Sequence, residues 1–547
     1  MASKHFSFIY IIPFLVIVIL LFSSPSHSAY YTSSAPFRAS AICNSTVDHY
    51  FCRSTLPQNV SWNQYDYSHY SFQQSLSTTR VLSFWMTKYL RRQWKLPISA
   101  IRALDDCKKL ADLNTDFLSK TMATLDSLKS SLSGLQAEDM QALFSAILTN
   151  QQTCLDGLQF TSSAWNATSD IHSHLSNGKK MHSLSLALFT NAWFKQIKSG
   201  RQANEEWRNK WEGLARRRRI IHANLKGVVV NNSVVVNPNG SGDFTTITDA
   251  INAAPNNTDI SNGYFVIFIA AGVYEEYVNV AKNKMNLMMI GDGINKTVIT
   301  GNRSVGDGWT TFNSATFIVV GQGFVGVDMT IQNTAGAIKG QAVALRSGAD
   351  MSTFYRCSFE GYQDTLYTHS LRQFYRECDI YGTVDFIFGN AAVVLQNCNI
   401  YPRLPIHGQS NEITAQGRTD PNQNTGISIH NCNIRASKEL GGSTDGTMTY
   451  LGRPWKEYSR TVYMQSFMDS VIAPIGWDKW SGDFALSTLY YTEFNNTGPG
   501  SDTSNRVTWP GYQVINTTDA ASFTVSNFIA GDAWLPQTGV PYTAGLI

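Results

Sequence analysis

The sequence repeats itself with a period of roughly 20 residues, and this repeat limits the possible fold more than any other feature. Cysteine marks the same position in four copies, at Cys357, Cys378, Cys398 and Cys432. Self-similarity at this period indicates a solenoid in which each repeat forms one coil. The copies are rich in Val, Ile, Phe, Tyr and Thr and lack the helical period of about 3.6 residues, so the coils consist of strands. The sequence therefore predicts a β-helix.

Two aspartates, Asp364 and Asp385, occupy equivalent positions in neighbouring repeats. Stacked coils lie about 4.8 Å apart, so the two carboxylates are expected to stand side by side. Two carboxylates at that distance cannot both ionise freely. Their pKa values separate, and one can act as an acid while the other stays anionic. Alternatively, such a pair only forms a hydrogen-bonded ladder or caps turns.

Other residues near the aspartates favour a catalytic interpretation. Gln363 directly precedes Asp364, and Gln341 lies about one coil before Gln363 in the sequence. Further on, L-G-R-P-W-K supplies Arg453 and Trp455, which taken singly would also fit a structural salt bridge and core packing. Two amides, two carboxylates, a guanidinium and an aromatic ring are the groups that an acyl-transfer site for a sugar-acid ester requires.

The repeat also places cysteines one coil apart. Cys357 and Cys378 have the same offset in the sequence as the two aspartates. A separation of about 5 Å matches the Cα distance of a disulfide, so the geometry predicts a bond between them. Cys398 and Cys432 are a second candidate pair, although their wider spacing implies an extended coil.

Five short motifs occur in order in the second part of the chain, namely G-V-Y-E-E (272–276), Q-A-V-A-L-R (341–346), G-Y-Q-D-T-L-Y (361–367), G-T-V-D-F-I-F-G (382–389) and L-G-R-P-W-K (451–456). Together they resemble the plant pectin methylesterases, from about Val235 to the C-terminus. The resemblance implies a right-handed parallel β-helix over 232–547 that uses neither a metal nor an organic cofactor. It also implies hydrolysis of the methyl esters of galacturonate units in pectin, giving pectate and methanol. N-P-N-G-S-G-D-F (237–244) departs from the Asp-Gly-Ser-Gly that usually opens this domain, far from the catalytic motifs.

The resemblance implies a role for each polar residue of the motifs. A nucleophilic carboxylate would attack the ester carbonyl, amides would stabilise the oxyanion, and the second carboxyl would protonate the departing methanol. The expected catalytic residues are Asp385 as nucleophile, Asp364 as proton donor, Gln363 as transition-state stabiliser, and Gln341. The expected substrate-binding residues are Thr311, Gln341, Arg453 and Trp455.

Residues 40–205 differ in kind from the repeats. Apolar residues recur at three- and four-residue spacings, as from Leu143 to Ile147, which predicts helices. The motifs A-L-D-D-C (103–107) and N-Q-Q-T-C-L-D-G (150–157) resemble the pectin methylesterase inhibitor family, which implies an all-α four-helix bundle. An inhibitor-like bundle joined to the enzyme class that it inhibits is predicted to be a pro-region that keeps the esterase inactive. Alternatively, the bundle acts only as a folding or targeting aid.

Four further cysteines, Cys43, Cys52, Cys107 and Cys154, lie in this helical region. In an exported chain they indicate two disulfides. Three pairings are formally possible. The nearest-neighbour pairing is predicted, with Cys43 bonded to Cys52 and Cys107 bonded to Cys154. No pair has the CxxC spacing of a metal site.

The N-terminus has the features of a targeting segment. Lys4 precedes a long apolar run (6–22), and small residues follow it. This pattern predicts a secretory signal peptide over 1–28, and the length of the run leaves an uncleaved signal anchor as the alternative. Sequons such as those at Asn44 and Asn495 fit a secreted glycoprotein. The expected location is the plant cell wall.

The segment 206–231 links the two regions. It contains four consecutive basic residues, Arg216, Arg217, Arg218 and Arg219. Such a run usually marks a solvated face or a nucleic-acid patch. In an exported chain, between a bundle and a solenoid, it predicts a site for a processing protease. Ile220 and Ile221 follow the arginines where the family's processing sites have Leu-Leu.

The overall charge and the site composition argue against some partners and leave two alternative functions, a β-helix glycosidase acting on pectin and a non-catalytic pectin-binding or inhibitor protein. A formal net charge of +3 gives no reason to expect nucleic acid. The expected partners are homogalacturonan pectin, the processing protease and a separate proteinaceous inhibitor. A β-helix glycosidase would also need two close carboxylates but not paired glutamines. A lyase would need a Ca²⁺-binding acidic cluster, and none stands out in 341–390. A non-catalytic pectin-binding or inhibitor protein would not need the intact catalytic set.

Overall fold

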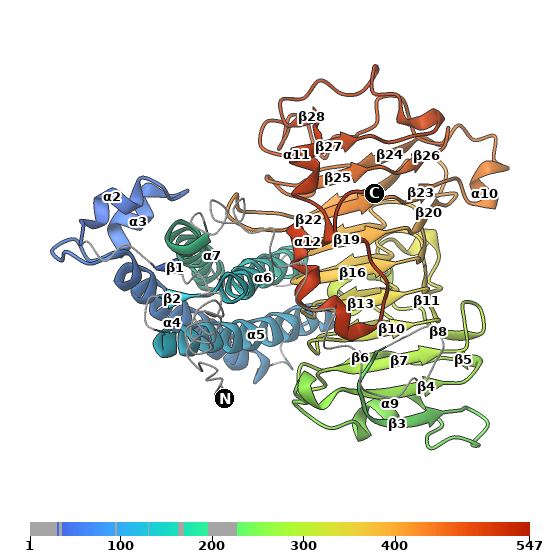
Figure 1. The fold of residues 1–547 in the computed structure, drawn as a ribbon, viewed down its shortest axis with the longest axis horizontal. Helices are drawn as coiled ribbons and strands as arrows, with labels where there is room; N and C mark the ends of the chain where they lie inside the picture. The colour runs from blue at the N-terminus through green and yellow to red at the C-terminus, as the bar shows by residue number, and fades with distance from the viewer. Residues whose placement is uncertain are drawn as a thin grey trace, which may run out of the picture.

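The computed structural model describes residues 30–31, 36–92, 94, 96–128, 131–161, 169–194 and 227–547. A helical half and a strand-rich half lie side by side (Figure 1). The predicted signal segment 1–28 and the four linker arginines lie outside the described residues. Within the described part of the chain, no helix is long and apolar enough to cross a membrane.

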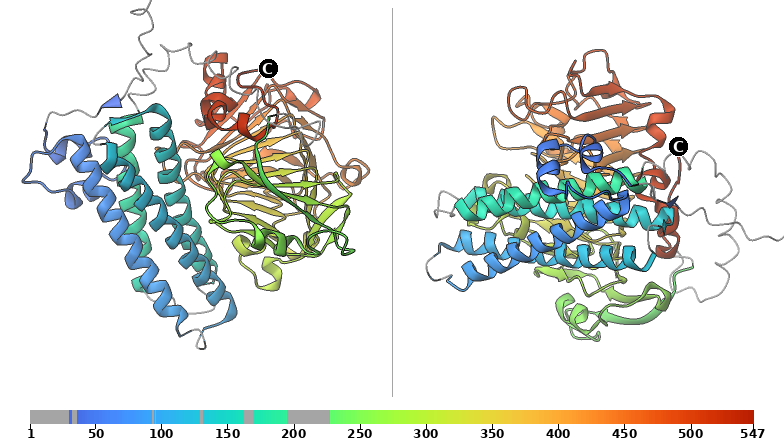
Figure 2. Two further views of the ribbon diagram at one scale, coloured as in Figure 1. Left: turned by 60° about the horizontal axis from the view of Figure 1, so that its bottom comes forward. Right: turned by 90° about the vertical axis from the view of Figure 1, so that its left-hand side faces the viewer.

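Four long helices among the described residues form a bundle, which confirms the all-α fold predicted for this half (Figure 2). In the bundle α4 and α6 each pack against both α5 and α7. An apolar centre that includes Phe72, Leu118, Phe144 and Phe189 holds these helices together. The helices are α2 Ala39–Cys43, α3 His49–Thr55, α4 Gln64–Leu90, α5 Ile98–Leu128, α6 Gly134–Thr161 and α7 Ser169–Phe189, with the π-helical η3 Thr190–Phe194 after them.

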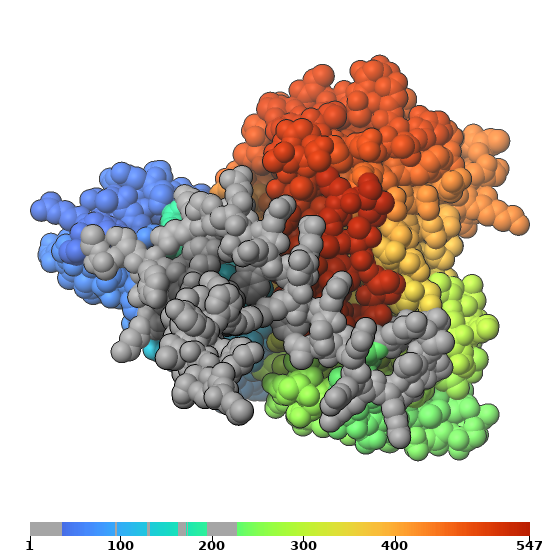
Figure 3. Space-filling view, viewed as in Figure 1, coloured from blue at the N-terminus to red at the C-terminus, as the bar shows by residue number. Residues whose placement is uncertain are grey.

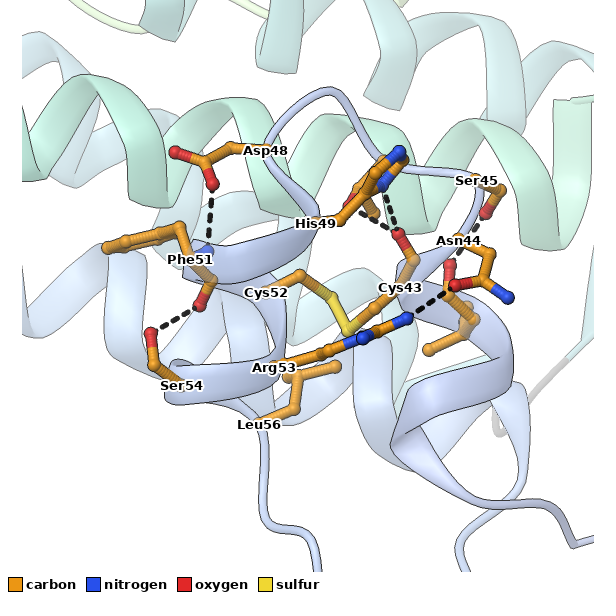
Figure 4. Close-up of a disulfide and its surroundings, with 12 residues drawn as sticks. Cys43, Asn44, Ser45, Asp48, His49, Phe51, Cys52, Arg53, Ser54 and Leu56 are labelled. Atoms are coloured by element: carbon orange, nitrogen blue, oxygen red, sulfur yellow. Dashed lines mark hydrogen bonds between the residues drawn. A yellow bond between two sulfur atoms is a disulfide. The ribbon is translucent and has the colours of Figure 1, made fainter.

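Two disulfides fasten the helical half, and both match the predicted nearest-neighbour pairing. Cys43 and Cys52 join α2 to α3 with a Cα separation of 5.5 Å. Figure 4 shows this bond beside the start of α3, where the backbone N–H of Phe51 donates to the carboxylate of Asp48 at 2.8 Å. The second bond joins α5 to α6 through Cys107 and Cys154, with a Cα separation of 4.6 Å.

The strand-rich half is a parallel β-helix, as the repeat predicted. Each complete coil adds one strand to each of three parallel sheets. Within every sheet the strands lie in chain order along the solenoid. The first sheet consists of β3 Val230–Val236, β4 Tyr264–Ile269, β7 Leu287–Gly291, β10 Val325–Val327, β13 Ser352–Tyr355, β16 Arg372–Arg376, β19 Ala392–Gln396, β22 Gly426–His430, β25 Arg460–Met464, β27 Tyr490–Phe494 and β28 Tyr512–Val514.

The other two sheets complete the coils. The second consists of β5 Gly272–Tyr274, β8 Thr297–Gly301, β11 Thr330–Asn333, β14 Ser358–Glu360, β17 Asp379–Gly382, β20 Asn399–Pro402, β23 Asn433–Ile434 and β26 Phe467–Met468. The third consists of β6 Val278–Val280, β9 Phe317–Val319, β12 Leu345–Ser347, β15 Leu366–Thr368, β18 Ile387–Gly389, β21 Asn411–Gln416 and β24 Thr449–Gly452.

The four repeat cysteines are buried and free, so the disulfide predicted between Cys357 and Cys378 is wrong, as is the candidate bond between Cys398 and Cys432. The strands around the first pair are in register, so the two side chains lie in parallel, one coil apart. Parallel side chains at the strand spacing of about 4.8 Å hold their Cβ atoms farther apart than the ~3.8 Å that a disulfide prefers. Each thiol donates instead to a backbone carbonyl one coil back, as Cys357 does to Gly326 at 3.5 Å.

The C-terminal segment covers the outer face of the first sheet. In the space-filling view it runs, in dark red, down the solenoid across several coils (Figure 3). Its short helices are α11 Thr517–Ala521 and α12 Val525–Ile529. Phe528 and Leu535 belong to the same buried apolar cluster as Val394 of the sheet. The first sheet is therefore covered on this face, whereas the third sheet faces the helical half.

Candidate active site

The third sheet carries the two aspartates of the repeat. Leu366 in β15 stands opposite Ile387 in β18, so Asp364 and Asp385 take equivalent places in neighbouring coils. The backbone N–H of Asp364 donates to the carbonyl of Val384 at 3.0 Å. Both aspartates have left-handed backbone, with φ values of 64° and 52°. Aspartate tolerates this conformation better than most residues, and the shared geometry sends both side chains the same way.

Arg453, which follows β24, binds one of the two carboxylates. Its Nε and Nη2 each donate to an oxygen of Asp385 at 2.8 Å, a bidentate ion pair. Burial and the charge of Asp385 raise the pKa of Asp364 well above its usual range. Burial also raises the pKa of Asp385, but the Arg453 guanidinium opposes this rise. The arrangement thus favours a proton on Asp364 and a negative charge on Asp385.

The two glutamines lie beside the aspartate pair. Gln363 directly precedes Asp364, and its carbonyl accepts a hydrogen bond from the backbone N–H of Ala342 at 3.1 Å. Gln341 is the residue before Ala342, so the two amides come from adjacent coils, as their spacing in the sequence predicted. Both side chains are half-buried rather than sealed in the core.

The remaining two predicted residues frame the same face. Trp455 is half-buried and meets the ring of Phe388 edge-on, with centroids 6.0 Å apart. A side chain on Gly417 would come within 2.7 Å of the Trp455 ring, so this glycine leaves the space that the indole occupies. Thr311 begins the short helix η7 (Thr311–Asn313), one turn before β9, and is half-buried.

Aromatic residues on this face were missing from the sequence-based site. Tyr367 and Phe388 stack one coil apart, with ring centroids at 4.1 Å, and Phe312 lies edge-on to Tyr367. The sequence contains the signal for the stacked pair, because each ring follows its aspartate by three positions, in D-T-L-Y and D-F-I-F. Rings on the wall of a carbohydrate site suit the apolar faces of sugar units.

The helical bundle packs directly against this face. One buried apolar cluster contains residues of both halves, including the Cys107–Cys154 disulfide. Trp455 packs against the same cluster. From the bundle the cluster includes Leu104, Cys107, Leu110, Cys154 and Leu158, and from the solenoid it includes Phe312, Val343, Tyr367, Phe388 and Ala415. The bundle therefore covers the aromatic surface that lies next to the aspartates.

Polar residues of the inhibitor-like motifs bond to the solenoid around this cluster. Asp106 of A-L-D-D-C accepts hydrogen bonds from the Thr310 hydroxyl at 2.6 Å and from the side-chain amide of Asn313. These two residues flank Thr311. Burial raises the pKa of Asp106 to about 7, although the Thr310 hydrogen bond and Arg346 oppose the rise.

The second motif, N-Q-Q-T-C-L-D-G, supplies contacts on the other side. The Thr153 hydroxyl lies 3.0 Å from Nε2 of His369. Lys456, next to Trp455, forms an ion pair with Asp156 at 2.8 Å. Both motifs that carried the inhibitor resemblance thus face the candidate site.

The described residues contain no group of three or more His, Cys, Asp or Glu side chains that could hold a metal ion. Around the aspartate pair, the Arg453 guanidinium bonds to Asp385, Gln363 directly precedes Asp364, and an aromatic ring follows each aspartate by three positions. The chemistry available from these groups is proton transfer, nucleophilic attack by a carboxylate and stabilisation of an oxyanion.

The fold and the site together define a hydrolase that acts on carbohydrate esters. Residues 233–532 match the family model for pectinesterase, and residues 39–188 match the model for plant invertase/pectin methylesterase inhibitor. The chain belongs to the pectinesterase family.

Relatives and a solved structure agree with this assignment. The chain is 56% identical to "Probable pectinesterase/pectinesterase inhibitor 20" of Arabidopsis thaliana, over 93% of this chain and 94% of that protein. It is 44% identical to "Pectinesterase 2" of Citrus sinensis, over 97% and 99% of the two chains. The structure of pectin methylesterase from carrot is similar to that of this chain, with a TM-score of 0.56 and 54% sequence identity. The matched region covers 60% of this chain and 100% of the carrot chain.

Proposed function

We propose that the chain hydrolyses the methyl esters of galacturonate units in pectin through an acyl-enzyme formed on Asp385. The ionised carboxylate attacks the ester carbonyl carbon, and the bond to the methoxy oxygen breaks. Asp364 gives its proton to the departing oxygen, so methanol leaves. Asp364, now ionised, takes a proton from a water molecule that attacks the acyl group, which releases pectate and restores both carboxyls.

The bidentate ion pair between Arg453 and Asp385, beside a carboxyl whose pKa is raised, is the observation that carries this proposal. It supports a charged nucleophile next to a protonated acid. Gln341 and Gln363 are proposed to donate to the oxyanion, a contribution typically worth about 3–4 kcal/mol for each donor. Trp455 and Thr311 are proposed to contact the sugar units, together with Arg453.

Product analysis tests this reaction directly. Enzyme freed of its helical half should release methanol from highly methylated pectin without generating new reducing ends. Reducing ends without methanol would indicate a glycosidase instead, since such an enzyme also uses two carboxyls. Binding to pectin with neither product would indicate a non-catalytic protein.

We also propose that the helical half is a pro-region that blocks the site until it is removed. The supporting observation is the shared apolar cluster, which places the bundle over Tyr367, Phe388 and Trp455. Because the bundle is tethered, its binding is intramolecular, and even a modest intrinsic affinity keeps the site largely covered. After removal of the bundle, the same face would be open to a separate inhibitor of the same class.

Removal is proposed to follow cleavage at Arg216 to Arg219 on a secretory route that ends in the cell wall. Replacing these four arginines by alanine in a secreting plant cell should yield an uncut chain that is inactive or retained inside the cell. Immunoblots of cell and wall fractions, with methanol release from each, would measure this. The double variant Arg91→Ala, Arg92→Ala removes an exposed basic pair from the end of α4 and should be processed normally. Full activity in the wall with the bundle still attached would contradict the proposal.

A further inference from the structure

A third carboxylate, Glu412, lies beside the aspartate pair, outside all the sequence motifs. In the register of the third sheet, Ile387 of β18 pairs with Thr414 of β21, so Glu412 stands one coil beyond Asp385. The backbone N–H of Phe386 donates to the carbonyl of Glu412 at 3.2 Å. The residue is only 1% exposed. The third sheet therefore holds carboxyl groups at equivalent places in three successive coils.

Among the described residues, the side chain of Glu412 has one hydrogen-bond partner. The Ser410 hydroxyl donates to Oε1 at 2.7 Å. Oε2 is buried and has no hydrogen-bond partner among the described residues. It lies 3.9 Å from Nη2 of Arg453, the same nitrogen that donates to Asp385 at 2.8 Å. Arg453 thus lies within ion-pair distance of both Asp385 and Glu412 but donates hydrogen bonds to Asp385 rather than to Glu412.

The charges around Glu412 come from several strands and loops. Asp385 and Asp478 are the acidic groups that face it, Arg453 is the cation, and the phenol of Tyr450 lies near it in β24. Burial raises the pKa of Glu412 to about 7, with the charges of Asp385 and Asp478 adding to the rise and Arg453 opposing it. Glu412 therefore changes charge near neutral pH.

We propose that Glu412 is a positioning residue whose ionised form, acting through Arg453 and Asp385, keeps the proton on Asp364 as the pH rises. The inference rests on the proposed function of the aspartate pair. The charge of Arg453 lowers the pKa of Asp364, and ionised Glu412, 3.9 Å from the same guanidinium, offsets part of that positive charge. Protonated Glu412 has no such effect. The residue thus extends activity toward alkaline pH while it leaves the acidic range unaltered.

The direction of the effect follows from this charge balance. Glutamine has the shape of a protonated glutamate and never ionises. Below about pH 7, where Glu412 is mostly neutral, Glu412→Gln should resemble the wild-type chain. Above that pH, the wild-type chain gains a charge that the variant lacks. The alkaline limb of the pH–rate profile is therefore expected about one pH unit lower in the variant, which makes it roughly tenfold slower on that limb.

The experiment compares pH–rate profiles of methanol release for chains secreted and processed by plant cells. Glu412→Asp, which keeps the charge, should restore the wild-type alkaline limb. Glu360→Gln is the matched control, because the Ser358 hydroxyl donates to Glu360 at 2.8 Å in the same i to i+2 arrangement. The charge of Glu360 acts on Tyr381 rather than on the aspartate pair. The pH–rate profile of Glu360→Gln should therefore match that of the wild-type chain.

Two results would overturn the inference while the proposed function stands. One is a Glu412→Gln profile that superimposes on that of the wild-type chain. The other is a loss of rate by the same factor at every pH, which a purely structural role would produce. A wild-type chain that releases no methanol would refute the proposed function and this inference with it. Failure of the proposed function can therefore be told apart from failure of the inference alone.

Discussion

Asp385→Asn is expected to lower the rate of methanol release by at least about 10⁴-fold, because the amide cannot act as the attacking carboxylate. The same substitution removes the anionic partner of Arg453, whose Nε and Nη2 both donate to this carboxylate. Methanol release from highly methylated pectin measures the loss. Binding to pectin should persist, since the aromatic wall of the site is unchanged.

Breaking this ion pair also affects stability, so the amount of folded protein must be measured beside the rate. Removing one partner of a buried ion pair typically destabilises the fold by about 3–5 kcal/mol. Because Arg453 is 24% exposed, the loss of stability here should be smaller. Asp379→Asn is a suitable control. This aspartate lies in β17 on the second sheet and bonds to Asn399 at 2.8 Å, away from Arg453. Near-normal turnover by a folded Asp385→Asn chain would contradict the nucleophile assignment.

The sequence predicted the solenoid and the relative positions of the aspartates because a β-helix repeats its backbone. Once the length of one coil is known, in-register pairing fixes which residues stand side by side. The positions of Asp364, Asp385 and Gln363 follow from that period alone. Arg453 and Trp455 lie outside it, and the family resemblance, rather than the repeat, placed them in the site.

The features that the sequence did not predict depend on the directions of side chains and on segments that do not repeat. Stacking put Cys357 and Cys378 next to each other but did not show that their side chains run in parallel, each donating to a carbonyl. Glu412 is farther from Asp385 in the sequence than one regular coil, because the segment before β21 is longer than in the preceding coils. No regular offset therefore links the two carboxyl groups. The contact between the halves was also not predictable, since it joins residues far apart in the sequence, such as Asp106 and Thr310.

That contact provides a decisive test of the blocked state. Asp106→Arg, introduced into a chain whose Arg216 to Arg219 are alanine, is expected to raise the activity of the uncut protein at least tenfold. Asp106 is buried against the solenoid, and Thr310 and Asn313 donate to it. An arginine there would leave both donors without their acceptor and would add a second cation near Arg346, whose charge already acts on this position.

The size of the expected effect follows from the cost of a buried, unpaired charge. That cost is about 3–5 kcal/mol, which weakens the contact by roughly 10²–10³-fold or more. Tethering gives the bundle an effective concentration on the order of millimolar. A loss of affinity of this size can exceed the gain in binding that the tether provides. The face that holds Tyr367 and Trp455 would then be open to pectin for part of the time.

Asp105→Arg provides the matched control for this prediction. It introduces the same side chain one position earlier on α5, where Asp105 is 45% exposed and pairs with Lys109 rather than with the solenoid. This variant should stay as inactive as the uncut parent. An intact bond between Cys107 and Cys154, together with an unchanged helical signal in circular dichroism, would show that the Asp106→Arg bundle is folded. If that folded, uncut chain released no more methanol than its parent, the helical half would not inhibit the enzyme through this contact.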